Sequence, residues 1–471
     1  MQKWAGGVRK RGLAEKTRPN GRNSIFVSHA SQISNANARR RLLWQRNFSF
    51  SAAFGRDPPS LARKIMKIGI VSPFMPHEFA GLFDEASKKL LPGIRGVLAT
   101  PVTGLARGWL ERGHTLSVFC LDQSVSSVQV LRGEDISIHV IPKRRARYCL
   151  QDFYRTECRL IRESVHGEAP EVLSAQWSYE HAFAALQCEV PTVVTCHDAP
   201  LRCAWIAKNW FTTCHLAVAW RVIRKAKRLV CVSPYTAAHI QKYFRPQGAM
   251  DVVPNGLMPE VFQRGERRLQ KAGSVRNSFV LCSVGGWGVL KNIATLLIAF
   301  ASVRERHPFA RLVLFGRNLG TGQAAEEWAR HRQLHQGVVF NGSTAYEKIL
   351  DFLESDADLM VHPSLIEANP MVLMEAMACG VPVVAGRHSG GVPWTLDDGR
   401  CGYLCDIRDE GALAETILNA MNQPDQRRAL VSRAFNFARD RFNQERAVSA
   451  NEKILREMLT PVPSRENQNA Q

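Results

Sequence analysis

Short continuous runs of apolar residues begin at residue 66 and alternate with longer stretches of helical periodicity. Runs of this kind are typical of parallel strands that are buried on both faces. In the first half they predict strands over Lys67–Ser72, Leu116–Cys120, Ser137–Ile141, Val172–Ala175, Thr192–Cys196, Arg228–Val232 and Asp251–Val253. Helices are predicted between them over Thr100–Arg112, Gln151–His166, Tyr179–Gln187, Cys214–Ala226 and Tyr235–Tyr243. The alternation predicts a doubly wound α/β domain over residues 66–263.

A second α/β pattern follows a polar, Arg-rich stretch over Gln263–Asn277, which we interpret as a linker. Strands are predicted over Phe279–Val284, Leu312–Phe315, Val338–Phe340, Leu359–His362 and Val381–Val384. Helices are predicted over Ala294–Arg304, Tyr346–Glu354, Met371–Cys379, Glu410–Asn422, Gln426–Asp440 and Gln444–Leu459. We place a second domain at residues 278–440, a C-terminal helix at 441–460 and a frayed tail at 461–471. Two Rossmann-like domains facing a cleft are expected, because such sheets bind ligands beyond the carboxyl ends of their strands.

Composition and charge narrow the class of protein. A chain of 471 residues is longer than a single domain of about 150 residues, so more than one domain is expected. The content of 22% charged and 45% hydrophobic residues is typical of a globular protein. No apolar run reaches the ~18 residues of a membrane-spanning helix. The net charge of +20 is concentrated in residues 1–65, which carry fourteen basic and two acidic residues. We expect this extension to be disordered and dispensable: either the true start is Met66, or the segment is a targeting signal or nucleic-acid arm.

Twelve cysteines raise the question of disulfides or metal sites. Several lie inside apolar strand-like runs, where cysteine behaves as a small hydrophobic residue. No Cys-x-x-Cys pair is present, so we expect no structural zinc and no metal. The thiols fit a reducing, cytoplasmic setting.

The strongest candidate chemistry lies in the segment His362–Val384. A buried strand ends at its start, a loop carries Glu367, and the helix that follows carries Glu375 on its second turn. The free backbone N–H groups at Met371 and Val372, at the positive end of this helix, suit a phosphate or a sugar hydroxyl. The alternative is that both glutamates are ordinary surface acids. The helix is apolar nearly all round, which favours a specific partner for Glu375.

These two glutamates, separated by seven residues and followed by Gly380–Val384, resemble the signature of glycosyltransferase family 4. Its members are retaining enzymes of the GT-B fold that use nucleotide-sugar donors. The resemblance covers most of residues 66–460, and further segments resemble the family in the same order: Arg112–His114, Thr195–Asp198, Val232–Tyr235, Val253–Gly256 and Ser389–Pro393.

The resemblance implies that the second domain binds the donor through Glu375, Lys291, Met371, Val372, Gly390 and Gly391. In the family the second glutamate binds the ribose hydroxyls, which corresponds to Glu375, and the first contacts the transferred sugar, which corresponds to Glu367. A carboxylate suits a vicinal diol, because it accepts two parallel hydrogen bonds. Lys291 occupies the place of the lysine that neutralises the donor pyrophosphate.

Catalytic roles are implied for Glu367, His197 and Lys291. His197 follows a predicted strand and corresponds to a residue near the reacting sugar carbon; the alternative is a structural histidine paired with Asp198. The sequence departs from the family in four places. Asn292 replaces a usual glycine after the lysine, and Asn369-Pro370 replace Phe-Gly between the glutamates. Gly286-Trp287 stand where a second cation is usual, and the acceptor-side loop reads Pro92–Gly96, so that Gly93, Arg95 and Gly96 replace a Gly-Gly pair. Arg95 is a candidate for the missing cation.

We therefore expect a retaining hexosyltransferase that moves a sugar from a nucleotide-sugar to a glycan or lipid-linked acceptor without a metal or cofactor. Tryptophans interleaved with basic residues over residues 202–228 suit contact with an anionic membrane, which would place the enzyme at its inner face. The same pattern fits an amphipathic helix with a solvated basic face. The rival functions are a nucleotide-sugar epimerase of the same fold and a nucleic-acid-binding protein. The latter lacks a recognisable motif, so we expect no nucleic-acid partner.

Overall fold

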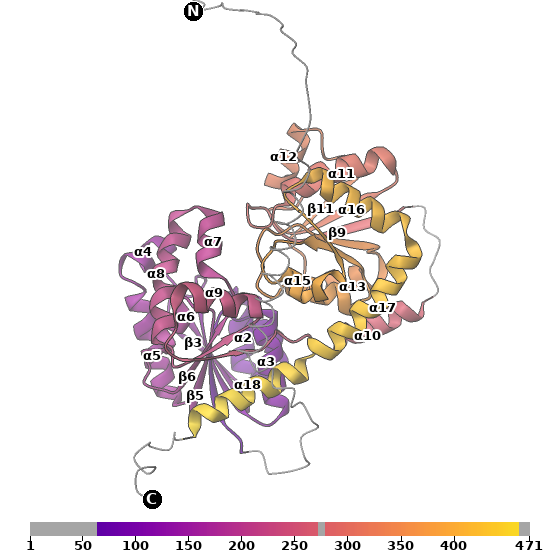
Figure 1. The fold of residues 1–471 in the computed structure, drawn as a ribbon. Coiled ribbons are helices and arrows are strands. Elements are labelled where there is room, and N and C mark those ends of the chain that lie inside the picture. Colours follow the sequence, from indigo (N-terminus) through magenta and orange to yellow (C-terminus); the bar gives the residue numbers. More distant parts are fainter. Residues whose placement is uncertain (1–63, 272–277, 461–471) are drawn as a thin grey trace, which may run out of the picture. The chain divides into compact units, whose positions relative to one another are not determined.

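The protein folds into two largely parallel sheets that are packed between helices (Figure 1). The computed structural model describes residues 64–271 and 278–460, and those from Ile65 onward belong to one compact unit. The first sheet has the strand order β3-β4-β2-β1-β5-β6-β7-β8, and the second has the order β11-β10-β9-β12-β13-β14. This confirms the predicted pair of doubly wound, Rossmann-like α/β folds.

The strands of the first sheet lie close to the predicted ranges: β1 Lys67–Val71, β2 Thr115–Asp122, β3 Gln129–Arg132, β4 Ile136–Pro142, β5 Val172–Gln176, β6 Thr192–Cys196, β7 Arg228–Cys231 and β8 Ala249–Val252. Those of the second are β9 Val280–Gly286, β10 Arg311–Arg317, β11 Val338–Gly342, β12 Leu359–His362, β13 Val383–Gly386 and β14 Tyr403–Cys405. The sequence pattern predicts neither β14 nor β3. Strand β3 is a four-residue edge strand that pairs antiparallel with β4.

The helices around the first sheet are α2 Glu85–Leu90, α3 Thr100–Glu111, α4 Ala146–Gln151, α5 Arg155–Glu168, α6 Glu180–Ala185, α7 Pro200–Ala207, α8 Trp210–Lys225 and α9 Pro234–Phe244, with 3₁₀ turns η1 Pro76–Leu82 and η2 Leu91–Gly93. The remaining helices are α10 Pro259–Gln270, α11 Ile293–Arg306, α12 Ala324–His331, α13 Tyr346–Ser355, α14 Met371–Ala378, α15 Val392–Thr395, α16 Glu410–Asn422, α17 Pro424–Arg441 and α18 Gln444–Leu459, with the 3₁₀ turn η3 Asp397–Gly399.

Burial on both faces of each sheet explains the continuous apolar runs. On β1, Ile68 and Ile70 join one apolar cluster, whereas Val71, which points to the opposite face, joins another. All three side chains are fully buried. Parallel strands must be covered on both faces, because helical crossovers connect them.

The predicted linker over Gln263–Asn277 is wrong for its first part, because α10 continues to Gln270. Residues 272–277 lie outside the described residues. The arginines that suggest a linker instead pair with acids of α13: Arg264 with Glu347 (2.7 Å) and Arg267 with Glu354 (2.7 Å). Helix α10 also packs tightly on α14, since a Cβ at Gly265 would lie 1.9 Å from the carbonyl oxygen of Ala378.

The last helix, α18, packs against α3 of the first sheet (Figure 1). Gln444 donates to the carbonyl of Gly104 (2.7 Å), and Arg112 contacts the buried Glu452 (2.5 Å). Burial opposes ionisation of Glu452, but the neighbouring His114 (3.4 Å) and hydrogen bonds from Arg456 and Arg112 hold the pKa of Glu452 well below its usual range. The helix therefore adds a buried charged contact to the first sheet's layer of helices.

The expectations for the extension and the tail lie outside the described residues, apart from Lys64 and Ile65. All twelve cysteines are free thiols, and nine of them are buried. Among the helices described between residues 64 and 460, none has the length and hydropathy that crossing a membrane requires.

Candidate functional site

Glu367 lies in the loop between β12 and α14, where two cationic or polar side chains converge on it. Lys291 Nζ donates to Glu367 Oε1 (2.6 Å), and His362 Nε2 lies 3.0 Å from the same oxygen. His362 ends β12 and Lys291 follows β9, and these two strands are neighbours in the second sheet. Sheet topology thus brings the two residues together at the carboxyl edge.

The electrostatics of this cluster keep Glu367 ionised. Burial alone would raise its pKa, but Lys291 and His362 hold the pKa of Glu367 well below its usual range. Within the described residues, Oε2 of Glu367 has no hydrogen-bond partner, and 15% of the side chain is exposed. This oxygen is therefore available to accept hydrogen bonds from a ligand.

A glycine pair allows a second loop to lie against Glu367. Gly391 N–H donates to the carbonyl of Glu367 (2.8 Å), and Glu367 N–H donates to the carbonyl of Ser389 (3.3 Å). Gly390 has φ +68°, and a Cβ at Gly391 would lie 1.9 Å from the carbonyl oxygen of Ala368. The approach therefore requires glycine at both positions.

Glu375 lies on α14 and is almost fully buried, with 4% of its surface exposed. The hydroxyl of Tyr346, at the start of α13, donates to Glu375 Oε1 (3.0 Å). Burial raises the pKa of Glu375 to about 7, although the tyrosine bond lowers it. The sequence does not single out Tyr346; the available signal is its position at a helix start just after β11.

No side chain among the described residues caps the first turn of α14, which leaves the backbone N–H groups of Met371 and Val372 without a capping partner there. Both residues are half-buried. Helix starts of this kind attract anions through their free N–H groups and the helix dipole. This arrangement agrees with the predicted phosphate contact, which stays a prediction.

His197 directly follows β6 in the first sheet, so it lies at the carboxyl end of that strand. Its Nε2 donates to Gln176 Oε1 (2.8 Å), and its ring lies 4.3 Å from that of Trp177. The Gln176 amide is oriented by donating to Ser174 (2.8 Å). Burial lowers the pKa of His197 to about 3, so the ring is neutral and its Nδ1 can accept a hydrogen bond.

Within the described residues, His197 bonds to Gln176 rather than to Asp198, and the hydroxyl of Tyr179 acts to lower the pKa of Asp198. Burial raises the pKa of Asp198 to about 6; the charge of Glu367 adds to the rise and that of Lys291 opposes it. Asp198 is therefore within electrostatic reach of both residues, although it belongs to the first sheet. The sequence motif contains Asp198 but assigns it no role.

Two other motifs of the first half meet the second sheet's loops. Asn255 N–H donates to Oδ1 of Asn369 (2.9 Å), which lies two residues after Glu367 in the sequence. A Cβ at Gly390 would lie 2.9 Å from the ring of Tyr235. The motifs Val232–Tyr235 and Val253–Gly256 thus contact the loops around Glu367, whereas the Arg112–His114 motif contacts Glu452 on α18 instead.

The acceptor-side loop is anchored at the end of β2. Gly96, with φ +66°, donates its N–H to Asp122 Oδ2 (2.6 Å), and Arg95 N–H donates to Ser124 Oγ (3.0 Å). Gly93 closes η2 and is exposed. Within the described residues, the Arg95 side chain makes no contact with Lys291 or Glu367, so its role as the missing cation stays a prediction.

Trp287 stands where a second cation is usual in the family that the sequence resembles. Trp287 packs on Trp328 (5.4 Å between ring centroids), and the backbone N–H of Trp287 donates to the carbonyl of Arg317 (3.0 Å). Within residues 64–271 and 278–460, no group of three His, Cys, Asp or Glu side chains could hold a metal ion.

Two family models match consecutive parts of the chain. "Glycosyltransferase Family 4" matches residues 98–261, and "Glycosyl transferases group 1" matches residues 266–437. The match between the chain and glycogen synthase from Mycobacterium tuberculosis is 27% identical over 56% of this chain and 64% of the relative. The match to D-inositol 3-phosphate glycosyltransferase from Corynebacterium kroppenstedtii is 32% identical and covers 40% of this chain and 44% of that relative. The chain thus spans less than two thirds of either relative.

Solved structures share the fold at low identity. Sucrose-phosphate synthase from Thermosynechococcus elongatus superposes with a TM-score of 0.66 at 18% identity, covering 83% of this chain and 99% of that one. Anabaena HepE in complex with UDP-glucose superposes with a TM-score of 0.58 at 20% identity, covering 83% and 100%.

Proposed function

Because the chain belongs to glycosyltransferase family 4, we propose that it is a retaining hexosyltransferase that moves a sugar from a nucleotide-sugar donor to a glycan or lipid-linked acceptor. One observation carries this proposal. An ionised Glu367, held by Lys291 and His362, lies within electrostatic reach of the His197–Asp198 loop of the other sheet. This proximity supports the proposal that the donor meets the acceptor beside Glu367.

The second sheet supplies the donor site in this proposal. Glu375 binds the ribose hydroxyls, while Lys291 and the N–H groups of Met371 and Val372 bind the pyrophosphate. The free Oε2 of Glu367 accepts from hydroxyls of the transferred sugar. The loop at Gly390 and Gly391, bonded to the Glu367 backbone, supports that contact.

The chemistry follows from these positions. As the bond between the sugar and the pyrophosphate breaks, charge grows on the leaving phosphate, and Lys291 with the α14 start stabilises it. The acceptor hydroxyl attacks from the same face and transfers its proton to a departing phosphate oxygen, which retains the anomeric configuration. His197, neutral, accepts a hydrogen bond from a sugar or acceptor hydroxyl through Nδ1. We propose that no metal or cofactor takes part, because the chain itself supplies the positive charge.

The acceptor-side loop, with Gly93, Arg95 and Gly96, completes the site from the first sheet. We place the reaction at the cytoplasmic face of a membrane that residues 202–228 contact, where a lipid-linked acceptor would be presented. Cys196 and Cys231, which are register partners on β6 and β7 and remain free thiols, suit such a reducing compartment. The family match favours neither the epimerase nor the nucleic-acid-binding alternative.

Calorimetry and thermal melts with UDP-, GDP- and ADP-sugars test this function, followed by slow hydrolysis of the bound donor with and without EDTA. We expect one donor to stabilise the protein and to be hydrolysed at the same rate in both conditions. Loss of hydrolysis with EDTA would overturn metal independence. Failure of every nucleotide-sugar to bind, or release of an epimerised nucleotide-sugar, would overturn the transferase assignment.

A further inference from the structure

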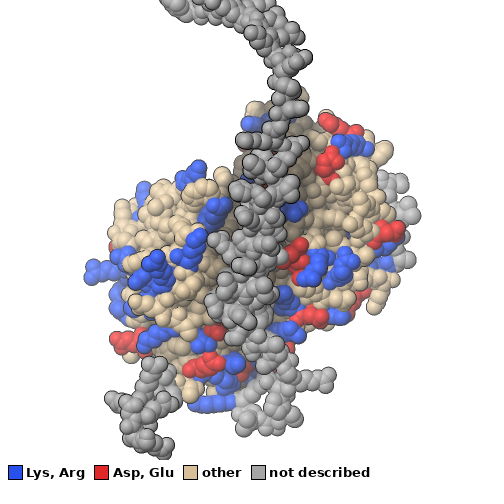
Figure 2. Space-filling view, viewed as in Figure 1, with Lys and Arg blue, Asp and Glu red and all other residues tan. Residues whose placement is uncertain are grey.

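An acid-free, basic stretch follows the candidate site in sequence. Residues 199–250 contain no Asp or Glu, and they contain nine basic residues: Arg202, Lys208, Arg221, Arg224, Lys225, Lys227, Arg228, Lys242 and Arg245. Within the described residues, only Arg228 of these nine forms an ion pair, with Asp251 and Glu457. Figure 2 shows blue Lys and Arg side chains predominating over α7 and α8, whereas blue and red are mixed over α10 and α13. Apart from Arg228, the basic side chains of this stretch are therefore not neutralised by acids among the residues that the structure describes.

Tryptophan exposure is concentrated on the same two helices. Trp205 on α7 is 61% exposed, and Trp210 and Trp220 on α8 are 60% and 50% exposed. The other tryptophans among the described residues are buried or half-buried. An exposed indole is costly in water, whereas a membrane interface solvates both its apolar ring and its N–H group.

Helix α8 presents one face to the sheet and another outward. Val218, Val222 and Ile223 are buried. Small Cys214 and Ala217 are exposed between the two tryptophans of this helix. With 16 residues, α8 is about 24 Å long, so its outward face forms an extended surface rather than a single contact point.

Cations accompany the tryptophans. The guanidinium of Arg202 lies 4.5 Å from the ring centroid of Trp205, and that of Arg224 lies 5.1 Å from Trp220. Such pairs hold a positive charge next to an aromatic ring without neutralising it. Both groups therefore stay available to an anionic partner.

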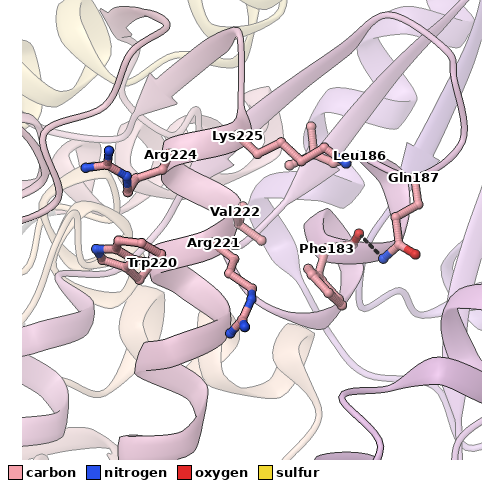
Figure 3. Close-up of a pocket in the computed structure, with 8 residues that line it drawn as sticks. All are labelled: Phe183, Leu186, Gln187, Trp220, Arg221, Val222, Arg224 and Lys225. Carbon is pink, nitrogen blue, oxygen red and sulfur yellow. Dashed lines mark hydrogen bonds between the residues drawn. The ribbon is translucent and has the colours of Figure 1, made fainter.

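A groove of about 540 Å³ lies between α8 and the end of α6. Figure 3 shows Trp220, Arg221 and Arg224 extending from α8, with Phe183 and Leu186 contributed by the α6 segment. The apolar floor of this groove suits the hydrocarbon part of a phospholipid, and its cationic rim suits the phosphate headgroup. A nucleic acid would match the charge of the rim but not the apolar floor.

We infer that this α7–α8 surface, defined by Arg202, Trp205, Trp210, Trp220, Arg221 and Arg224, docks the protein onto an anionic phospholipid membrane. The indole rings lie at headgroup level and the guanidinium groups contact lipid phosphates. Only Ala199 separates Asp198 of the candidate site from α7. Docking through α7 therefore brings the acceptor side of the site to the bilayer, and this consequence rests on the proposed function.

Vesicle co-sedimentation of the full chain tests the docking surface. Phosphatidylcholine vesicles containing phosphatidylglycerol are compared with pure phosphatidylcholine, at low and high salt. The variants are Arg221→Glu/Arg224→Glu, and Trp205→Ser/Trp210→Ser/Trp220→Ser. Matched controls on the second half are Lys348→Glu/Arg408→Glu for charge and Phe309→Ser, at a side chain that is 77% exposed, for apolar exposure.

We expect anionic vesicles to bind the unmodified chain and both controls, and each surface variant to lose at least tenfold in affinity. The basic extension over residues 1–65 is present in every variant. Its contribution to vesicle binding is therefore the same in all of them and cancels when their affinities are compared. Equal binding of all five proteins would overturn the proposal. So would an absence of vesicle binding with RNA binding lost in the same variants, which would assign the surface to nucleic acid.

Calorimetry with the nucleotide-sugar donor separates the docking surface from the proposed function. Both surface variants should bind the donor like the unmodified chain, because the substituted residues lie outside the donor site. If the chain binds anionic vesicles but no donor, the proposed function fails and the docking surface stands. If it binds donor equally in all variants and no vesicles, the docking surface fails and the proposed function stands.

Discussion

The hydroxyl of Tyr346 donates a hydrogen bond of 3.0 Å to Glu375, a carboxyl group that is only 4% exposed. This bond links the start of α13 to the helix that carries the proposed ribose contact. It favours the ionised form of Glu375, whose pKa burial raises to about 7. Tyr346 is thus a positioning residue for Glu375, and the protonation of Glu375 is poised within the physiological range.

Tyr346→Phe should weaken nucleotide binding most strongly near neutral pH. Without the hydroxyl the pKa of Glu375 rises further, so the carboxylate that accepts the ribose hydroxyls forms only at higher pH. Calorimetric titrations from pH 6 to 9 should show the midpoint of the affinity profile displaced upward relative to the unmodified chain. A uniform loss of affinity with an unchanged midpoint would show that Tyr346 acts only through packing.

Glu375→Gln should stabilise the fold at alkaline pH while weakening donor binding. Burial raises the pKa of Glu375 from 4.5 to about 7, so its contribution to stability is present below 4.5 and is lost as the pH rises through 7. The loss amounts to about 3 kcal/mol in the alkaline limit. The neutral amide removes this pH dependence, and melts at pH 5 and 8.5 should show a gain for the variant only at pH 8.5.

The same variant loses a charged acceptor of the ribose hydroxyls. Nucleotide affinity should therefore fall by roughly 1.5–3 kcal/mol, the usual contribution of a hydrogen bond to a charged group. Unchanged affinity for the free nucleotide at pH 8.5 would refute the ribose assignment.

Glu367→Gln should lower turnover and leave nucleotide affinity intact. The proposed partner of Glu367 is the transferred sugar, whereas the nucleotide is held by other groups. The amide keeps the size of the side chain but loses the charge that Lys291 and His362 stabilise. Turnover of the donor and calorimetry with the nucleoside diphosphate check this. Equal loss of diphosphate binding in this variant and in Glu375→Gln would show that the two glutamates do not divide the donor as proposed.

Lys291→Ala should reduce the rate by a larger factor than it reduces donor affinity. The leaving pyrophosphate gains charge as the sugar bond breaks, so a fixed cation stabilises the transition state more than the bound donor. Steady-state kinetics give kcat and KM separately, and Lys453→Ala, at an exposed lysine on α18, is the matched control. A raised KM with unchanged kcat would make Lys291 a binding residue only.

The sequence pattern predicts most helices and strands well, because the formation of each element depends mainly on residues that are close in sequence. The apolar helix after Glu367 and the strand that ends at His362 were readable from sequence. The sequence pattern does not predict helix α10, because its stabilising partners, the acids of α13, lie more than 80 residues away in sequence. A run of arginines looks the same whether those partners exist or not.

Non-local contacts also limit the prediction of the site. The pairing of Lys291 with Glu367 spans 76 residues and that of Tyr346 with Glu375 spans 29, and spacing alone indicates neither. The resemblance to the family selected Lys291, because its motif position is known. It did not select Tyr346 or the role of Asp198, because these depend on burial and on side chains that only the fold brings together.

Gly391→Ala should damage the donor site through a single added methyl group. Gly391 has φ −80°, which alanine adopts without strain, so the backbone conformation itself is not the obstacle. The obstacle is the added Cβ, which would lie 1.9 Å from the carbonyl oxygen of Ala368, and backbone on both sides cannot yield as a flexible side chain could. The loop must then move away and lose the hydrogen bond from Gly391 N–H to the Glu367 carbonyl (2.8 Å). We expect a lower melting temperature and weaker donor binding. Gly167→Ala is the matched control, because a Cβ there meets nothing within 4 Å and Gly167 lies in the last turn of α5, where alanine adopts the helical backbone without strain. If Gly391→Ala melts and binds donor like Gly167→Ala, the contact between this loop and Glu367 does not support the donor site.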